Sequence, residues 1–408
     1  MNKTTCILLL LLAAIPLAAG NSGFSYAGYP VNYFGKDIYS LGMGDTGASD
    51  VFRNNTGYGN PAQHNINNRS LFSTGILMGY NSYKSQDPQG QEYSYIDNSL
   101  DLPYFSLSVP LQNHRVGFQL NSYASGVVAN QRESETPDGT EFTEKREMDR
   151  YIYRADLIYS LHLGRHSLGI SGNYYFGHET QMLSQDAGYG LFSTREELKR
   201  SFKNPSFSLG YLMRLEKLAW GVHYGMGLTL DGEEVRTSIH ETEDPVDYEY
   251  KLPHQFSASV TALPAPEFKV ATDFHYSLDS QIDPDSLRDS WKLGLGVAYE
   301  PDSEKRQNAF FRLPLRAGIS YRMLPFSVED AAVDELAFSL GLTLPLKGDV
   351  NRIDLGFQIV NRGSLEQNKL VDNSFLLMCG FTGFDIFSKA PDRRAPRDIP
   401  VKEDIGTW

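Results

Sequence analysis

Most of the chain alternates between apolar and polar positions with a period of two residues. From Tyr151 to Leu163 the odd positions are almost all apolar, whereas the even positions include Arg154 and Asp156. The same alternation recurs from Leu218 to Leu230 and again from Leu336 to Leu344. A period of two is typical of β-strands that present one face to an apolar environment. The pattern therefore predicts an all-β chain.

Strands of this kind are numerous and long. About 14 segments show the pattern, and each has the roughly 9–11 residues that a tilted transmembrane strand requires. They lie near residues 69–82, 102–112, 114–128, 147–163, 166–178, 202–216, 218–230, 248–262, 266–278, 289–300, 312–324, 334–345, 350–361 and 374–387. This number and length of strands predict one large closed architecture.

The connections alternate between short and long. Short links such as Gln112-Asn113 and Gly164-Arg165 alternate with long polar links such as residues 130–146 and 179–201. Short periplasmic turns and long external loops are the layout of an outer-membrane barrel. We therefore predict a 14-stranded antiparallel transmembrane β-barrel in a bacterial outer membrane, with both chain termini periplasmic. Within one long link, Ser193 to Lys199 has capping-box spacing, which predicts either a short helix or a frayed polar loop.

A soluble β-sandwich would show similar alternation, but its apolar faces would point inward. Three features favour the membrane: the segments are long, the face opposite the apolar one is small or polar, and aromatic residues lie near segment ends, where an interfacial girdle would need them. These aromatic residues are Tyr151, Tyr153, Trp220, Trp291, Tyr299 and Tyr321.

The N-terminal region has a different character. A charged start, an apolar run from Ile7 to Leu17 and small residues after it indicate a signal peptide over residues 1–20. Residues 21–68, which contain the glycine-rich stretch Ser40 to Gln63, are too rich in glycine for a stable helix or strand, and predict a hatch or plug inside the barrel. We expect the barrel over residues 69–388 and a disordered periplasmic tail over residues 389–408.

Composition narrows the functional classes. The net charge of −13 is unfavourable for binding nucleic acid. Cys6 leaves with the signal peptide and Cys379 remains alone, so no intramolecular disulfide is expected. The histidines are scattered and form no cluster with cysteine, so no metal site and no cofactor is expected.

Candidate functional residues lie in the hatch and on the inward faces of the strands. Proline fixes φ, and an asparagine side chain can bond neighbouring backbone, so Asn60-Pro61-Ala62 is either part of a gate or an ordinary turn before the first strand. The candidate gate residues are Gly42, Gly44, Asn60, Pro61 and Ala62. Inward charges could contact a ligand or the plug, or form a salt-bridged lumen without a ligand role; they are Arg154, Asp156, Arg214, Asp273, Arg352 and Asp354.

Catalysis is not expected. His162, His223 and His275 all lie on predicted inward faces, but no spacing singles out a Ser–His–acid triad. We therefore predict that the chain is not an enzyme and has no catalytic residues.

Two ordered groups of motifs resemble the outer-membrane transporter family typified by the long-chain fatty-acid transporter, the FadL-type barrels, in a divergent branch. At the N-terminal end these are Leu41-Gly42-Met43-Gly44, Gly47-Ala48 and Asn60-Pro61-Ala62. At the C-terminal end they are Asn361-Arg362-Gly363-Ser364, the stretch Asn368 to Asn373, and Asp385-Ile386-Phe387-Ser388.

The resemblance implies a 14-stranded barrel with a luminal hatch that passes hydrophobic molecules inward, often releasing them sideways into the bilayer through a defect in the wall. Fatty acids and hydrocarbons are the implied substrates, and lipid and lipopolysaccharide the implied surroundings. Relatives commonly carry an acidic pair and a small residue followed by an aromatic one before Asn-Pro-Ala, whereas this chain has Arg53 to Gly59 there. The chain should differ most from its relatives at this insert.

The same resemblance includes barrels that act as adaptors or shuttles in type IX secretion or surface attachment, with secretion-system proteins as partners. That is the alternative function. A general porin is a third possibility, but an N-terminal plug argues against an open channel.

Overall fold

The computed structural model describes residues 22–24, 31–32, 37–57, 59–63, 70–87, 89–135, 139, 141–186, 188, 193–301, 312–346 and 351–383. The predicted signal peptide and the predicted C-terminal tail lie outside these residues, and the predicted hatch and barrel lie within them in part. No helix in these ranges is long and apolar enough to cross a membrane.

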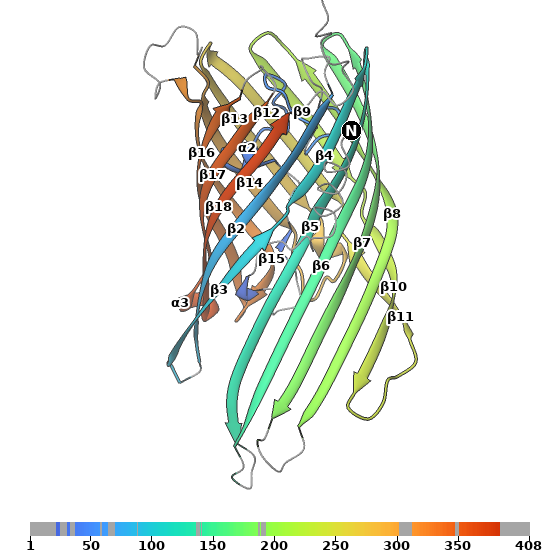
Figure 1. The fold of residues 1–408 in the computed structure, drawn as a ribbon, viewed down its shortest axis with the longest axis vertical. Coiled ribbons are helices and arrows are strands. Elements are labelled where there is room, and N and C mark those ends of the chain that lie inside the picture. Colours follow the sequence, from blue (N-terminus) through green and yellow to red (C-terminus); the bar gives the residue numbers. More distant parts are fainter. Residues whose placement is uncertain are drawn as a thin grey trace, which may run out of the picture.

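The wall of the molecule is a cylinder of tilted strands (Figure 1). In its first half the strands are β2 (Leu71–Gln86), β3 (Glu92–Asp101), β4 (Tyr104–Leu111), β5 (His114–Glu135), β6 (Glu141–Leu163), β7 (His166–Asp186), β8 (Thr194–Arg214), β9 (Leu218–Gly225) and β10 (Leu228–Ser238). In its second half they are β11 (Val246–Leu252), β12 (Gln255–Ala265), β13 (Phe268–Ser277), β14 (Ser290–Tyr299), β15 (Leu315–Val328), β16 (Ala331–Pro345), β17 (Arg352–Ser364) and β18 (Leu370–Gly383). The remaining elements are β1 (Val31–Asn32), α2 (Ile38–Leu41), η2 (Asp279–Gln281) and α3 (Leu365–Asn368).

These strands form one closed antiparallel sheet. Of the 18 strands among the described residues, β1 is a two-residue strand that pairs with β5. Three pairs of successive strands each occupy one position in the wall, because both members of a pair lie end to end along the same neighbour. β3 and β4 lie along β2, and β9 and β10 lie along β8. β11 and β12 in turn lie along β10 and β9. The wall described by these residues therefore has 14 strands, and the pairing of β18 with β2 closes it. The predicted fold class is confirmed.

The two faces of the wall explain why this alternating sequence forms a barrel. On β6, Leu157 is 63% exposed on the outer face, whereas Asp156 and Ser160 are buried on the inner face. Large apolar residues likewise cover the outside of the neighbouring strands. A soluble β-sandwich would bury those apolar side chains, so the structure decides for an apolar exterior and a polar lumen.

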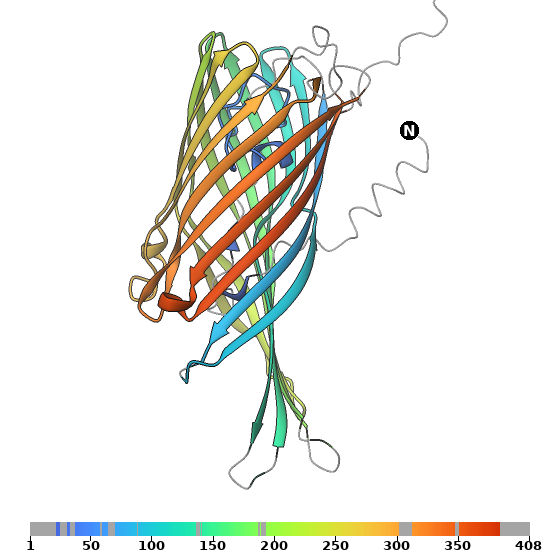
Figure 2. The same cartoon turned by 90° about the vertical axis from the view of Figure 1, so that its left-hand side faces the viewer.

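The long loops are shorter than predicted, because the strands extend into the segments that the sequence predicts as loops. β5, β6, β7 and β8 have 22, 23, 21 and 21 residues, and with β10 and β11 they project beyond the rest of the wall (Figure 2). The predicted helix or loop over Ser193 to Lys199 is wrong, because Thr194 to Lys199 pair with β7 and Glu196 to Lys199 pair with β10 as well. Hydrogen bonding to two neighbours therefore overrides a local capping signal.

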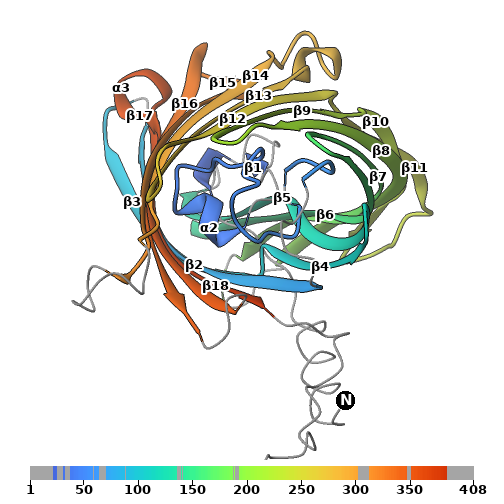
Figure 3. The same ribbon diagram turned by 90° about the horizontal axis from the view of Figure 1, so that it is seen from above.

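A single N-terminal segment fills the lumen. Seen from above, the chain from α2 to Gln63 lies inside the ring of strands (Figure 3). The earliest described residues are elsewhere: Phe24 packs on Leu324, Phe326 and Val333, at the end of the barrel where β15 turns into β16. Gly383 lies at the opposite end, where it pairs with β2. Both chain termini lie outside the described residues, so their common periplasmic location stays a prediction.

Candidate functional site

The luminal segment, which we define as residues 37–63, is a compact irregular structure with one helical turn. Asp37 caps α2, because its carboxylate accepts a hydrogen bond from the Ser40 amide at 3.0 Å. Of the five glycines in the segment, all but Gly42 have positive φ. A segment of this kind cannot be stabilised by its own helix or sheet, so it depends on contacts with side chains.

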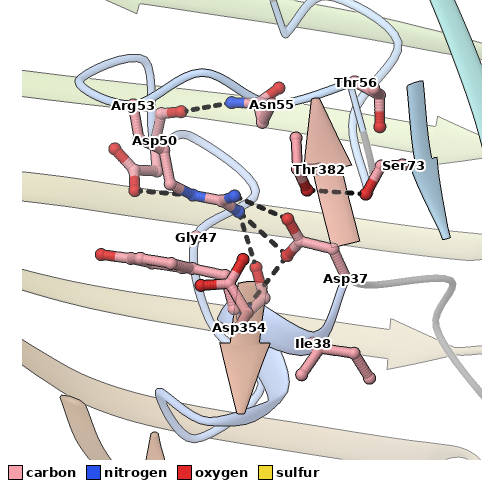
Figure 4. Close-up of polar contacts among 12 residues, drawn as sticks. Asp37, Ile38, Gly47, Asp50, Arg53, Asn55, Thr56, Ser73, Asp354 and Thr382 are labelled. Atoms are coloured by element: carbon pink, nitrogen blue, oxygen red, sulfur yellow. Dashed lines mark hydrogen bonds and ion pairs between the residues drawn. The ribbon is translucent and has the colours of Figure 1, made fainter. Parts of the chain in front are cut away.

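Arg53 is the centre of the luminal segment (Figure 4). Its guanidinium donates to both carboxylate oxygens of Asp37, at 2.6 and 3.0 Å, and to Asp50 at 3.2 Å. It also lies over the ring of Tyr39, 4.2 Å from the centroid. Burial raises the pKa of the Asp37 carboxyl, but the charges of Arg53 and Arg352 outweigh burial and hold that pKa below its usual range. The carboxylate is therefore charged and paired inside the lumen.

Buried charges of the wall reach the same cluster. Lys269 of β13 donates to Asp50 and to Glu300, both at 3.0 Å. Lys292 of β14 pairs with Asp45. The bridges to Asp50 and Asp45 join wall strands to the luminal segment, so the wall holds the segment in place electrostatically.

Three of the predicted inward charges lie against the luminal segment. Asp273 accepts a hydrogen bond from the Ala48 amide at 3.0 Å. Arg352 lies 5.5 Å from the centroid of the Tyr39 ring. Arg214 lies 6.0 Å from the centroid of the Phe52 ring.

Asp354 is linked to the luminal segment through two arginines. It pairs with Arg352 at 2.9 Å and with Arg316 at 3.3 Å. Arg316 in turn covers the Tyr39 ring at 4.1 Å. Asp354 therefore positions two cations that contact the segment, and a contact of its own with a ligand remains a prediction.

Arg154 and Asp156 form a separate pair at 2.8 Å. Asp156 also accepts hydrogen bonds from Asn121 at 3.0 Å and from Asn173 at 2.6 Å. Both charges line a polar cavity of about 40 Å³ between the luminal segment and the wall, together with His223. That volume suits water and is far below the roughly 300–1,000 Å³ of a small-molecule pocket.

Glycines of the wall receive the luminal segment at close range. A Cβ on Gly318 would lie 2.2 Å from the Gly44 nitrogen, and one on Gly296 would lie 2.1 Å from the Met43 oxygen. Gly44 itself has φ of 72° and approaches the Leu295 carbonyl so closely that its own Cβ would lie 2.6 Å away. Backbone therefore packs directly on backbone here, which only glycine permits.

Asn60 connects the luminal segment to the wall through hydrogen bonds. Its side-chain nitrogen donates to the carbonyl oxygens of Tyr211 and Val222, at 3.3 and 3.2 Å, on the neighbouring strands β8 and β9. Its side-chain oxygen accepts from the Ala62 amide at 2.9 Å. An asparagine is required at this position because the contact needs a donor and an acceptor on one side chain.

The same turn packs on two further glycines. A Cβ on Gly210 would lie 2.1 Å from the Asn60 side-chain oxygen, and one on Gly169 would lie 2.2 Å from the Pro61 carbonyl carbon. Ala62 is fully buried against Leu212. The structure thus brings four predicted gate residues, Gly44 and Asn60 to Ala62, against the wall; a Cβ on the fifth, Gly42, would lie 3.1 Å from the Cα of Gly341.

One interruption divides the wall. β3 pairs only with β2, and β5 pairs with β4 as far as Asn121 and then only with β6 and the short β1. The last hydrogen bond from β5 to this side of the wall is donated by the Ser122 amide to the oxygen of Pro103, between β3 and β4, at 3.0 Å. Beyond that bond β3 and β5 diverge, as Figures 1 and 2 both show. We call this divergence the fork.

The local sequence explains the fork. Pro103 has no N–H to donate and interrupts the line between β3 and β4. On the facing strand Tyr123 is an extra residue, because the register with β6 shifts between Ser122 and Ala124. A β-bulge bends a strand and ends its pairing on one side, so the two interruptions together open the wall.

The histidines make local contacts. His162 bonds with Ser167 at 3.0 Å and His275 with Ser257 at 2.7 Å, each through Nδ1. No group of three or more His, Cys, Asp or Glu suited to a metal ion occurs among the described residues.

The most important ionic residues, Arg53, Lys269 and Arg316, were not among the predicted site residues. Lys269 and Arg316 do follow the inward alternation of their strands, so the pattern could have indicated them. In the sequence Arg53 stands out only as a departure from related sequences, because nothing in its neighbourhood shows where Asp37 and Tyr39 will lie.

Comparison with known proteins agrees with this geometry. A protein-family model described as BamG matches residues 1–385 of the chain. No curated protein matches it.

Several solved structures have the same fold. A FadL homologue from Pseudomonas aeruginosa is 11% identical with a TM-score of 0.60, over 87% of this chain and 99% of its own. The toluene transporter TodX from Pseudomonas putida is 16% identical with a TM-score of 0.59, over 86% and 98%. The toluene transporter TbuX from Ralstonia pickettii is 12% identical with a TM-score of 0.54, over 86% and 98%. At such identities the likeness shows that the fold is the FadL-type barrel.

Proposed function

The chain belongs to the BamG family, and from its fold and its fork we propose that it is an outer-membrane barrel for passive uptake of hydrophobic small molecules. The solved relatives with this fold include toluene transporters. Uptake in this chain would proceed from the end with the long projecting strands, and exit would be sideways through the fork. The fork is the observation that carries the proposal.

The luminal segment makes a sideways exit more favourable than a straight passage. Its cluster of buried ion pairs, its contacts with wall glycines and the bonds of Asn60 leave a polar cavity of only about 40 Å³ beside it. Moving an apolar solute past these groups would separate paired charges that are costly to leave unpaired. The fork, by contrast, opens where β3 and β5 no longer bond to each other and β5 bonds on that side only to the two-residue β1, so a solute can leave there without displacing residues 37–63.

Closing the fork tests this function. Deleting Tyr123 removes the extra residue of the bulge, so β5 can continue its pairing past Ser122. Cells that produce the deletion variant should take up a radiolabelled hydrocarbon such as toluene no faster than cells without the protein. Tyr123→Ala is the matched control, because it removes the side chain and its bond with Gln255 but keeps the bulge; it should retain most of the uptake.

A heat-dependent shift in electrophoretic mobility should establish that both variants form folded barrels. Unchanged uptake by a folded deletion variant would contradict the lateral route. Equal uptake by wild-type cells and by cells without the protein would contradict the transport function itself.

We also infer a second candidate function, an adaptor for protein secretion or surface attachment, from the projecting strands. A transmembrane strand needs roughly 9–11 residues, whereas β5 to β8 have 21 to 23. The additional residues of β5 to β8 form a sheet that projects beyond the ends of the shorter strands, where it is accessible to a protein partner. Shortening β5 and β6 by four residues each should abolish co-purification of secretion or surface proteins while hydrocarbon uptake continues. Co-purification that persists in the shortened variant would contradict a role of the projecting strands as the partner site.

A further inference from the structure

An apolar groove of about 450 Å³ lies on the outer face of the wall, across β8, β9, β12 and β13. Ala258 lies in register between Val222 of β9 and Phe274 of β13, and its small side chain leaves a hollow between the two larger ones. Leu209 and Phe256 border the hollow and are 45% and 44% exposed. The volume lies within the roughly 300–1,000 Å³ of small-molecule sites. The groove can therefore hold an apolar chain.

The groove has a polar end toward the short turns. Tyr211 lines the groove, and its hydroxyl bonds with Nδ1 of His166 at 2.7 Å. The Tyr211 ring also packs edge-on against Trp220, with the ring centroids 5.4 Å apart. His166 is the first residue of β7 and is exposed. Tyrosine and tryptophan side chains are typical of the boundary between hydrocarbon and head groups. The groove therefore extends from the hydrocarbon region to that boundary.

Two cations lie just beyond His166, in adjacent short turns. Arg165 precedes His166, and its backbone oxygen accepts a hydrogen bond from the Arg214 amide at 2.7 Å. This bond joins the turn before β7 to the end of β8, three residues before Lys217. Arg165 and Lys217 are both exposed, and neither forms an ion pair among the described residues. Their charges exceed that of Glu216, the acid of the same turns.

We propose that this groove binds an anionic phospholipid, with one acyl chain over Ala258 and the head-group phosphate at Arg165, His166 and Lys217. With Tyr211 as the donor, the proton of the neutral His166 ring is on Nε2, which can donate to a phosphate oxygen. Arginine and lysine supply the opposite charge, and each contributes about a fivefold gain in affinity near an anionic lipid surface. The inference goes beyond the proposed uptake function, because this ligand is held on the wall and does not pass through it.

A second histidine–tyrosine pair shows which features distinguish this site. His114 is the first residue of β5, and its Nδ1 bonds with the Tyr159 hydroxyl at 2.7 Å, as in the pair of His166. The preceding turn, Gln112-Asn113, carries no charge. Arg115 is buried and donates to the Gln63 oxygen inside the lumen. The pair alone is therefore a feature of the girdle, whereas the two exposed cations are specific to the end of the groove.

Native mass spectrometry of the full chain in detergent can test the head-group preference. The lipids are dioleoyl phosphatidylglycerol and dioleoyl phosphatidylethanolamine, which share their acyl chains and differ in net charge. Phosphatidylglycerol should bind about tenfold more tightly. The double variant Arg165→Gln with Lys217→Gln should lower the affinity for phosphatidylglycerol by about the same factor, and change that for phosphatidylethanolamine by less than about threefold.

Two matched controls separate the site from general effects. Lys203→Gln with Lys251→Gln removes the same charge from exposed positions on the projecting strands, so it should preserve the preference for phosphatidylglycerol. Ala258→Phe fills the groove and should weaken both lipids by a similar factor. Val260→Phe adds the same ring two residues further on the outer face of β12, outside the groove, and should leave both affinities unchanged. A heat-dependent mobility shift establishes that each variant is folded.

Several results would overturn the inference. Equal affinity of the wild-type chain for the two lipids would refute the head-group preference, and tighter binding of lipid A than of phosphatidylglycerol would refute the choice of a phospholipid. An equal loss in both double variants would show a general charge effect and not a site at Arg165 and Lys217. Unchanged binding by Ala258→Phe would refute the placement of the acyl chain. None of these results bears on uptake, which closing the fork tests separately.

Discussion

Replacing Arg53 by alanine should release the luminal segment from the barrel without unfolding the wall. Arg53 is 6% exposed and is the only described residue that forms an ion pair with Asp37. The substitution leaves the Asp37 carboxylate, itself 2% exposed, buried without that cation. Asp50 keeps a partner, because Lys269 remains 3.0 Å away. The loss is therefore concentrated at one carboxylate.

The size of the effect follows from that geometry. Removing one member of a buried ion pair costs about 3–5 kcal/mol, because the remaining charge stays buried and unpaired. Arg53 also loses its contact with the Tyr39 ring, at 4.2 Å, worth about 1 kcal/mol more where the cation is partly desolvated. Since 1.36 kcal/mol is a factor of ten, a loss of about 3–5 kcal/mol raises the population of released segments by roughly 10²- to 10³-fold or more.

Hydrogen exchange measures this population directly. The amides of residues 37–57 should exchange faster by that factor in Arg53→Ala, whereas amides in β13 to β18 should exchange at the wild-type rate. Arg53→Lys keeps the charge but cannot donate to both carboxylate oxygens of Asp37, so it should give an intermediate rate.

A double variant separates charge from packing. Combining Arg53→Met with Asp37→Asn removes both charges and keeps most of the volume, so it should recover at least half of the lost protection. Exchange in Arg53→Ala within threefold of wild type would refute the idea that this ion pair holds the segment. Equal acceleration in the strands would show that the whole barrel had loosened instead.

Three further predictions concern the same segment. Gly318→Val places side-chain atoms where the Gly44 nitrogen now lies, 2.2 Å from the Cβ position. This clash should destabilise the bound luminal segment by about 1–3 kcal/mol and accelerate its hydrogen exchange accordingly, whereas the solvent-exposed Gly90→Val should not affect that exchange. The pKa of Asp37 is lower in the folded protein than its ordinary value of 3.8, so its stabilising contribution should be fully present above about pH 4 and decline as the pH falls further; loss of protection between pH 7 and pH 5 would contradict this sign. Deleting residues 40–62 should raise ion conductance in planar bilayers, since it removes the material that fills the lumen, and conductance equal to wild type would show that the wall itself closes the pore.

The alternating pattern was sufficient to predict the wall because each strand carries its own signal. Every predicted segment overlaps a strand line of the barrel, and the inward positions of Asp156 and Asp273 follow from the period alone. The strand ends were less predictable. The extensions of β5 to β8 are mostly polar on both faces beyond the wall, so the alternation becomes weak and they look like loops in the sequence.

The contacts of the luminal segment could not be predicted in the same way. Whether Lys269 reaches Asp50 depends on how far each strand is shifted against the next around a closed barrel, and that shift sums over all the pairings. The fork has a similar origin. Pro103 is visible in the sequence, but its consequence depends on Tyr123 forming a bulge on the facing strand.

The wall glycines show that segment and barrel specify each other. Gly210 and Gly318 lie on inward positions of β8 and β15, where a barrel without a plug would lose nothing by carrying alanine. Glycine in a strand costs stability, on the order of 0.5–1 kcal/mol relative to alanine, so each of these positions weakens the wall. What offsets this cost is the approach of Asn60 and Gly44, within 2.1 and 2.2 Å of the two missing Cβ atoms. The polar alternation therefore determines a barrel, whereas the glycines along it determine that this barrel is filled.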